Sequence, residues 1–255
     1  MRFPGTVLIT GATAGIGEAC ARAFAAAGAR LVLTGRRTER LDALAGELRQ
    51  AHGTESRLLA LDVRDREAVF AAVGGLPAEW AAVDVLVNNA GLGRGVDKVQ
   101  VGDPDGWDEM VDTNVKGLLY VTRAVTPGMV ERGRGHVINL GSVAGHEVYP
   151  GGAVYCATKH AVGAITRGLR MDLLGTGVRV STVDPGMVET EFSVVRFHGD
   201  RDRADKVYQG MTPLTAADIA DTVLWVATRP PHVNIDEIII KPTDQASATL
   251  VHRSE

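Results

Sequence analysis

Cysteine, aromatic side chains, net charge and long apolar runs are all scarce in this chain of 255 residues. The two cysteines, Cys20 and Cys156, cannot form a disulfide framework, and we expect both to be free thiols in a reducing compartment. The apolar run Val7-Leu8-Ile9 is too short for the apolar region of a secretion signal. No apolar stretch reaches the roughly 20 residues that span a bilayer. We therefore expect a cytoplasmic protein without a membrane partner.

The charge and the spacing of the histidines argue against two further kinds of site. The formal net charge is −4 and the pI about 6.0, so the chain lacks the basic footprint of a nucleic acid partner. The seven histidines form no H-x-x-H or H-E-x-x-H pattern, and we therefore predict no bound metal. Cys156 directly follows Tyr155, which invites a redox interpretation, but a small packing residue explains it more simply.

The residues that are present favour one α/β domain. Hydrophobic residues make up 45% of the chain and aromatic residues 5%, an aliphatic bias typical of a parallel sheet buried on both faces. No Pro/Ser-rich linker or charge block divides the sequence, so we predict a single domain over residues 1–255.

Strand-length apolar runs alternate with helix-like segments along most of the chain. The predicted strands are residues 6–10, 30–34, 57–61, 84–88, 136–140, 178–183 and 236–240. The predicted helices are residues 15–27, 38–50, 64–73, 107–132, 154–174 and 215–228. With right-handed crossovers, this βαβ order gives a single Rossmann-type, doubly wound parallel sheet of about seven strands with helices on both faces.

The first predicted strand runs into a glycine-rich turn, Gly11-Ala12-Thr13-Ala14-Gly15-Ile16-Gly17. The missing side chains let the backbone approach a pyrophosphate, and the N-terminus of the next helix offers N–H donors to it. Many such segments are plain tight turns, so the spacing alone is weak evidence for a nucleotide site.

The residues after the second predicted strand indicate which nucleotide binds. An NAD site usually has Asp or Glu there to hold the ribose 2′-hydroxyl. Here Arg36 and Arg37 follow Gly35, and a guanidinium pairs with the 2′-phosphate of NADP. The alternative, that both arginines merely face solvent at a helix start, is disfavoured because a helix N-terminus does not stabilise cations. We therefore predict NADP(H), with Arg36 as the leading contact and Arg37 as its support.

Tyr155 and Lys159 are spaced i, i+4 and share one face of a predicted helix. A nearby ammonium favours the phenolate, so Lys159 is expected to lower the pKa of Tyr155 and make it a general acid/base. Ser142 lies just past the fifth predicted strand, where its hydroxyl could stabilise a reacting oxygen. A Y-x-x-x-K spacing alone is more often a solvated helix face than a catalytic pair.

These motifs occur together in one order: Thr10-Gly11…Gly15-Ile16-Gly17, Asn88-Asn89-Ala90-Gly91, Asn114, Ser142, Tyr155, Lys159 and Pro185-Gly186. In this order they resemble the short-chain dehydrogenase/reductase family over most of the chain. The resemblance implies hydride transfer, with Tyr155 exchanging a proton with the substrate and Lys159 also holding the nicotinamide ribose. It further implies that Asn114 bends its helix around a water that feeds protons to Lys159. The expected catalytic residues are Asn114, Ser142, Tyr155 and Lys159.

The residue patterns and the resemblance together place the coenzyme on the glycine turn and the strand ends. Asp62 and Val63 resemble the family's contact with the adenine. Asn88, Ala90 and Gly91 resemble the residues that lie next to the adenine ribose. The residues that resemble the family's nicotinamide contacts are Pro185, Gly186, Val188 and Thr190. The expected coenzyme residues are Gly11, Thr13, Ala14, Gly15, Ile16, Gly17, Arg36, Arg37, Asp62, Val63, Asn88, Ala90, Gly91, Tyr155, Lys159, Pro185, Gly186, Val188 and Thr190.

Within that family the chain is more similar to bacterial NADP-dependent 3-hydroxy acid dehydrogenases of the serine/allo-threonine type. The resemblance rests on residues 110–117, 122–132, 191–197 and 231–235. It implies a small 3-hydroxy acid or its carbonyl counterpart as substrate, and a homotetramer built through the long fourth and fifth helices. Residues 241–245 look equally like clavaldehyde-reducing enzymes, so a reductase of a bulkier metabolite is one alternative. A non-catalytic NADP-binding regulator is another.

The stretch from Val188 to about Met211 interrupts the strand–helix alternation and follows Pro185-Gly186. It is therefore placed to act as a substrate lid over residues 188–211. A 3-hydroxy acid carries a carboxylate that must meet a cation, and Arg196 is the candidate. The expected substrate-binding residues are Ser142, Tyr155 and Arg196, although a surface position in a mobile loop would explain Arg196 equally well.

Overall fold

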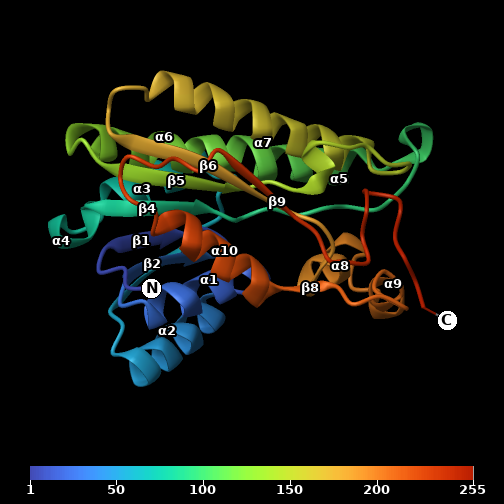
Figure 1. Cartoon of the computed structure of the whole chain (residues 1–255), viewed down its shortest axis with the longest axis horizontal. Coiled ribbons are helices and arrows are strands. Elements are labelled where there is room, and N and C mark those ends of the chain that lie inside the picture. The colour runs from blue at the N-terminus through green and yellow to red at the C-terminus, as the bar shows by residue number, and fades with distance from the viewer. Residues whose placement is uncertain (255) are drawn as a thin grey trace.

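The computed structural model describes residues 1–254, and a seven-stranded parallel sheet lies at its centre (Figure 1). The strands are β1 (Thr6–Ile9), β2 (Arg30–Gly35), β3 (Ser56–Ala60), β4 (Val83–Asn88), β5 (Gly135–Leu140), β6 (Val178–Pro185) and β9 (Glu237–Ile240). Their order is β3-β2-β1-β4-β5-β6-β9, and every neighbouring pair is parallel. The predicted doubly wound fold is confirmed, and all seven predicted strands are present.

Two layers of helices cover the sheet, one on each face (Figure 1). One layer holds α1 (Gly15–Ala26), α2 (Thr38–His52) and α10 (Ala216–Ala227), and the other holds α3 (Arg66–Gly74), α5 (Pro104–Val111), α6 (Leu118–Glu131) and α7 (Ala153–Asp172). Each layer buries its own aliphatic core against the sheet, with Phe24 and Ile219 on the first face and Val69 and Met129 on the second. A short helix, α4 (Ala78–Ala81), precedes β4.

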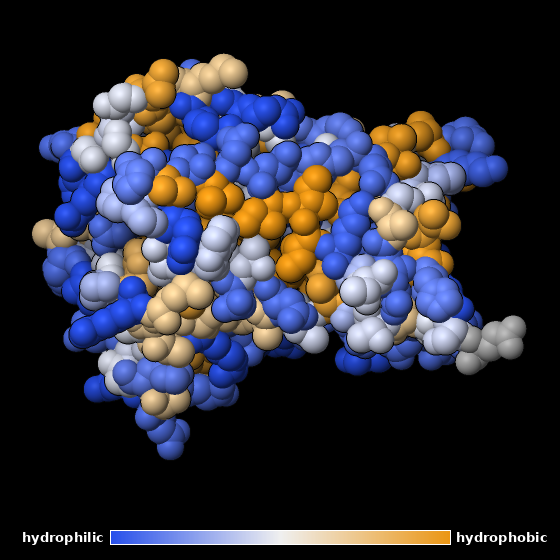
Figure 2. Space-filling view, viewed as in Figure 1, coloured by the Kyte–Doolittle hydropathy of each residue, from blue (hydrophilic) through white to orange (hydrophobic). Residues whose placement is uncertain are grey.

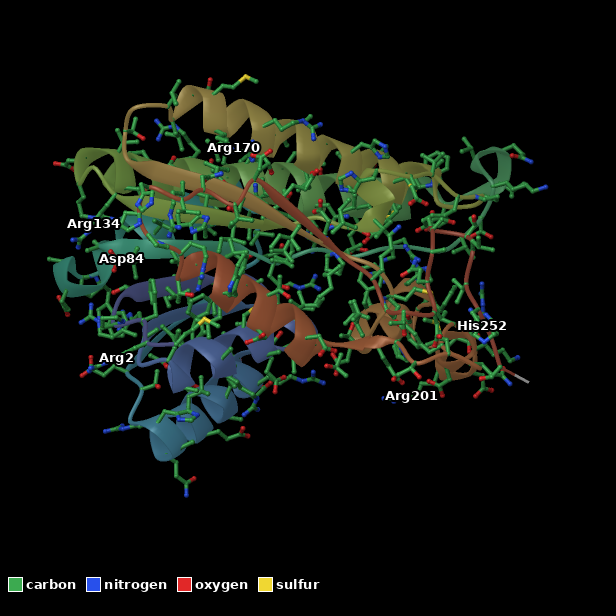
Figure 3. The ribbon with its side chains drawn as sticks, viewed as in Figure 1. Arg2, Asp84, Arg134, Arg170, Arg201 and His252 are labelled. Carbon is green, nitrogen blue, oxygen red and sulfur yellow. The ribbon has the colours of Figure 1, made fainter. Side chains whose placement is uncertain are left out.

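The strands begin at one end of the molecule and finish at the other, where a ligand site is expected. At the end where the strands begin, Arg134 Nε lies 3.5 Å from Asp84 Oδ1, and Figure 3 shows both residues at that end of the molecule. Arg201 and His252 lie at the opposite end, near the carboxyl ends of the strands (Figure 3). The strand order reverses between β1 and β4, and open α/β sheets bind ligands at the carboxyl edge of such a reversal.

The predicted helix over residues 107–132 is interrupted. A π-helical stretch, Asp112–Gly117, separates α5 from α6, with Asn114 in its middle. The buried Asn114 side chain explains the widened turn: its Oδ1 accepts from Leu92 N and its Nδ2 donates to Leu92 O, both at 2.8 Å. Asn114 Nδ2 also donates to Thr158 Oγ1 of α7 at 3.1 Å. The irregular helix therefore ties the loop after β4 to the helix that carries Tyr155 and Lys159.

Residues 188–211, the predicted lid, form a small lobe beside the carboxyl edge of the sheet (Figure 1). The lobe contains β7 (Val188–Glu189), α8 (Glu191–Arg196) and α9 (Arg201–Lys206), and β7 pairs with β8 (Leu214–Thr215) in a second small sheet. The Tyr208 hydroxyl donates to Val188 O at 2.8 Å and so closes the lobe on itself. Within residues 1–254, no helix has both the length and the apolar character needed to cross a bilayer.

Candidate active site

A cavity of about 550 Å³ lies along the carboxyl edge of the sheet, a size typical of small-molecule and coenzyme sites. The glycine turn, the ends of β2 to β6 and helix α8 line it. Most of the predicted site residues are in this lining: Gly11, Thr13, Ala14, Gly15, Ile16, Arg36, Arg37, Asp62, Val63, Ala90, Gly91, Ser142, Tyr155, Lys159, Pro185, Gly186, Val188, Thr190 and Arg196. Gly17, Asn88 and Asn114 are not in it.

The glycine turn has the shape that a phosphate cradle requires. Gly11 and Gly15 have φ of 66° and 55°, in the region that favours glycine. A Cβ on Gly17 would lie 2.4 Å from Gly11 O, so this glycine allows the turn to pack against α1. Ala14 precedes α1 and gives it no side-chain cap, which leaves the first N–H groups of this helix available to an anion. These residues fit a dinucleotide pyrophosphate.

The two asparagines after β4 hold the scaffold in different ways. Asn88 is buried, and its Nδ2 donates to Thr122 Oγ1 and Asn139 Oδ1, both at 2.9 Å. It therefore ties β4 to β5 and α6 behind the cavity, and this geometry gives its side chain no direct contact with the cavity. Asn89 Nδ2 donates to Thr10 O at 2.8 Å and to Gly11 O at 3.2 Å, which fixes the glycine turn.

At the end of β2, arginines gather around Glu191, the first residue of α8. Arg37 donates from Nη1 to Glu191 Oε2 at 2.9 Å, and from Nε and Nη2 to Thr13 Oγ1 at 3.2 and 3.0 Å. Arg40, one turn further along α2, donates from Nη1 to Glu191 Oε1 at 2.8 Å. Arg36 is the most exposed of the three and lies 3.9 Å from Asp62 Oδ2. The sequence interpretation missed Arg40, although its i, i+3 spacing from Arg37 was a usable signal.

Ser142 lies two residues after the end of β5 and lines the cavity. Its Oγ accepts from Ala144 N at 3.1 Å and lies 3.4 Å from Pro185 O at the end of β6. The hydroxyl is therefore held between the ends of β5 and β6, and its proximity works to lower the pKa of Tyr155.

Lys159 lies deep in the cavity lining. Its Nζ donates to Leu140 O at 2.8 Å and lies 6.0 Å from the centre of the Tyr155 ring. Burial lowers the pKa of Lys159 from its ordinary value to about 8, and the charge of Asp184 works against that decrease. The ammonium is thus directed towards a backbone carbonyl.

The pKa of Tyr155 differs from the sequence-based expectation. Burial raises it above the ordinary value, while the charge of Arg196 and a hydrogen bond with Ser142 work to lower it. The expectation of a lowered pKa is therefore wrong for this structure, because the effect of burial outweighs the groups that favour the phenolate, and Lys159 is not among the main ones. The nearby cation that favours the phenolate is Arg196.

Arg196 is part of the cavity lining and does not lie on an outer surface of the lobe of residues 188–211. Its guanidinium carbon is 4.7 Å from the centre of the Tyr155 ring and 5.0 Å from that of Phe192. Nη2 donates to the Tyr149 hydroxyl at 3.0 Å. A Cβ on Gly93 would lie 2.8 Å from Arg196 Nε, so the bare backbone there makes room for the guanidinium.

The guanidinium of Arg196 has no acidic partner among residues 1–254, and its buried Nε has no hydrogen-bond acceptor there. The other arginines of the cavity lining, Arg36 and Arg37, each lie within 4.0 Å of a carboxylate. Within residues 1–254, Arg196 is therefore the arginine of the cavity lining that has no carboxylate partner, and it lies next to the tyrosine that would exchange the proton.

A group of potential metal ligands lies near the end of β6. His146 Nε2 is 2.7 Å from Asp184 Oδ2 and 3.7 Å from Glu237 Oε1, and the three ligand atoms fall within 4.8 Å of one another. The histidine and Asp184 already satisfy each other by a hydrogen bond. The absence of a bound metal stays a prediction from the sequence.

This fold and this residue set define a class of protein. The short-chain dehydrogenase family model matches residues 5–200, and the chain belongs to that family. It is an oxidoreductase that acts on a hydroxyl group or the corresponding carbonyl, and the alternative of a non-catalytic regulator is set aside.

Three related proteins narrow the comparison. The chain is 52% identical over 250 residues, 97% of its length and 99% of the relative's, to the NADP-dependent 3-hydroxy acid dehydrogenase YdfG of Salmonella typhi. It is 49% identical to the sulfoacetaldehyde reductase of Chromohalobacter salexigens over 241 residues, 94% of each chain. The closed form of a serine dehydrogenase complexed with NADP+ is 49% identical, with a TM-score of 0.91, covering 98% of this chain and 100% of that one. The predicted similarity to 3-hydroxy acid dehydrogenases is confirmed.

Proposed function

We propose that this enzyme transfers a hydride between NADP(H) and a small 3-hydroxy acid or its carbonyl counterpart, and that Arg196 holds the substrate's anionic group. The coenzyme is NADP. The guanidinium beside Tyr155 is the observation that carries the choice of substrate, because a half-buried cation without a carboxylate partner favours an anionic ligand.

The residues around the cavity fit the coenzyme along its whole length. The glycine turn and the start of α1 would hold the pyrophosphate, Arg36 and Arg37 the 2′-phosphate, and the ends of β3 and β4 the adenosine. Pro185, Gly186, Val188 and Thr190 would border the nicotinamide, and Lys159 its ribose. When bound, NADP(H) supplies or accepts the hydride.

The protein's own groups would then orient the substrate and move its proton. Ser142 Oγ hydrogen-bonds the reacting oxygen and stabilises the charge that develops there. Tyr155 gives its proton to that oxygen in reduction and takes it back in oxidation. Asn114 ties the loop after β4 to α7 through Leu92 and Thr158, and so supports the helix that carries Tyr155 and Lys159.

The anionic group of the substrate would bond to the guanidinium of Arg196. Phe192 and the Tyr155 ring stack on this group and keep water from its faces, which strengthens an ion pair. The names of two relatives support this class of substrate, since a 3-hydroxy acid carries a carboxylate and sulfoacetaldehyde a sulfonate. We propose a carboxylate for this chain.

A substrate panel tests the proposal. Turnover is measured with NADP+ and serine, 3-hydroxyisobutyrate or 3-hydroxypropionate, and with NADPH and neutral aldehydes, both small and bulky. Higher kcat/KM for the carboxylates than for neutral compounds of similar size is the expected result. A preference for bulky neutral aldehydes would favour the clavaldehyde-type alternative. It would also contradict the proposed role of Arg196 as partner of the substrate's anionic group.

We further propose a single domain with residues 188–211 as its lid, and a homotetramer in the cytoplasm. Exposed apolar side chains support the assembly: Leu119 of α6 and Met171 of α7 are 42% and 76% exposed, and Leu174, just after α7, is 86% exposed. Figure 2 shows hydrophobic residues at the upper edge of the molecule, over the end of α7, and across the middle of the face that bears β9 and α10. Light scattering should give four times the 27.0 kDa mass of the chain.

A further inference from the structure

One short helix connects the two ends of the cavity. Glu191 is the first residue of α8, and its carboxylate bonds Arg37 and Arg40 beside the expected 2′-phosphate site. Arg196 is the last residue of the same helix and lies over the Tyr155 ring. The ion pairs join residues that are far apart in the sequence, and they tie the start of α8 to the coenzyme end of the cavity.

A 2′-phosphate would compete with Glu191 for the same donors. Arg37 already gives Nε and Nη2 to Thr13, so Nη1 is its remaining donor group, and Glu191 uses it. Nη1 of Arg40 bonds both carboxylate oxygens, at 2.8 and 3.0 Å. A phosphate that takes up these donors must either displace Glu191 or sit beside a second anion.

The ion pairs of Glu191 are of the kind that a phosphate can replace. The side chains of Arg37, Arg40 and Glu191 are 42%, 48% and 47% exposed, and exposed pairs contribute little to stability. Burial works to raise the pKa of Glu191, but hydrogen bonds from Arg40 and Arg37 lower it overall, so the carboxylate stays charged at neutral pH. A phosphate with nearly two negative charges binds arginine more strongly than a carboxylate with one.

We propose that Glu191 is a coenzyme-specificity residue: the 2′-phosphate displaces it from Arg37 and Arg40, and α8 carries this displacement to Arg196 in the substrate site. The proposal rests on the proposed 2′-phosphate and substrate sites. NADP(H) would then change the position of α8 and of Arg196, and NAD(H) would not. The enzyme would therefore select between the two coenzymes through the arrangement of its substrate site as well as through the contacts that bind them.

The first test measures binding without a substrate. Calorimetry compares adenosine 2′,5′-bisphosphate with adenosine 5′-monophosphate, which differs from it by the 2′-phosphate alone. In the wild type the bisphosphate should bind more tightly. Glu191→Gln should strengthen bisphosphate binding about three- to tenfold and leave monophosphate binding unchanged, because only the 2′-phosphate competes with the Glu191 carboxylate.

Glu189→Gln is the matched control, since Glu189 is exposed, lies two residues earlier and makes no ion pair within residues 1–254. It removes the same charge from the same segment and should leave both affinities unchanged. If Glu189→Gln strengthens bisphosphate binding as much as Glu191→Gln does, the effect is one of general charge and the proposal fails.

The second test follows the lid by amide hydrogen exchange. In the wild type, the bisphosphate should change exchange in residues 188–197 and the monophosphate should not. In Glu191→Gln, exchange should already differ in the free protein and should no longer respond to the bisphosphate. If the bisphosphate changes exchange in residues 188–197 equally in both proteins, Glu191 does not link the 2′-phosphate to the lid and the proposal fails.

The outcomes distinguish this proposal from the proposed 2′-phosphate site and the proposed substrate site on which it rests. Equal binding of bisphosphate and monophosphate by the wild type would refute the 2′-phosphate site itself. Tighter bisphosphate binding by the wild type that weakens in Glu191→Gln would leave the site intact but make Glu191 a positioning residue for the arginines, against the proposal. Neither experiment uses a substrate, so the proposed substrate class stands or fails separately.

Discussion

The guanidinium carbon of Arg196 lies 4.7 Å from the centre of the Tyr155 ring, in van der Waals reach of the side chain that would exchange the substrate's proton. One arginine can therefore act twice, as a partner for the substrate's anion and as a positive charge beside the phenol. Its charge works to lower the pKa of Tyr155 against the effect of burial. A substitution at Arg196 can separate these two roles.

Arg196→Met should raise KM for 3-hydroxy acids about 10- to 100-fold, because a hydrogen-bonded ion pair in a half-buried site is lost. KM for neutral aldehydes of similar size should change far less. Removing the cation should also raise the pKa of Tyr155 further, so the pH profile for alcohol oxidation should move to higher pH. Arg201→Met, in the same lobe but exposed, is the control; equal effects on both substrate classes would count against the clamp.

Tyr155→Phe should lower kcat by about 10² to 10⁴ while NADPH still binds, because the ring remains and the proton donor is gone. Fluorescence titration with NADPH measures the binding and steady-state kinetics the turnover. Phe192→Leu, which alters the packing against the same ring but keeps the hydroxyl, should retain most of kcat. Loss of NADPH binding along with activity would instead give the hydroxyl a structural role.

Arg36→Asp should lower kcat/KM for NADPH about 10- to 100-fold and relax the preference towards NADH. The substitution removes a charge-assisted bond to the 2′-phosphate and adds a repulsion at the same place. Arg66→Asp makes the same change of charge at an exposed residue that begins α3, and it should leave the coenzyme ratio unchanged. If the ratio is also unchanged in Arg36→Asp, the main contact must be sought at Arg37 or Arg40.

Lys159 should make the free protein less stable at neutral pH than at high pH. Its pKa of about 8 in the folded state lies below the ordinary value of 10.5 for a lysine, so the unfolded chain binds the proton more tightly. Between these values the free energy of unfolding rises with pH, and below about 8 the whole penalty, on the order of 3 kcal/mol, is present. Lys159→Met should therefore be stabilised relative to the wild type at pH 7, with a gain that shrinks towards pH 10.

Urea unfolding at pH 7, 8.5 and 10 measures this difference in free energy. Lys98→Met, at an exposed lysine, serves as the control and should follow the wild type at each pH. A stability difference between Lys159→Met and the wild type that does not vary with pH would show that the buried lysine does not titrate in this range.

The sequence predicted the sheet well because each strand is a short aliphatic run between helix-like segments. The lobe of residues 188–211 was recognised only as an interruption, since β7 and α8 are too short to show a period. The pairs Arg40–Glu191 and Arg196–Tyr149 join segments that no local pattern connects. The pKa of Tyr155 could not be predicted from its spacing to Lys159 either, because it depends on burial and on where the ammonium points.

The π-helical stretch around Asn114 makes this part of the chain roughly one residue longer than a regular helix over the same distance. Deleting Val115 would allow α5 and α6 to run as one regular helix with its full ladder of hydrogen bonds. The same deletion would turn Asn114 away from Leu92 and Thr158 and release the support beneath Tyr155 and Lys159. A more regular helix would therefore give a less active enzyme. The π-helical stretch sacrifices local hydrogen-bond regularity and keeps the support for the catalytic residues.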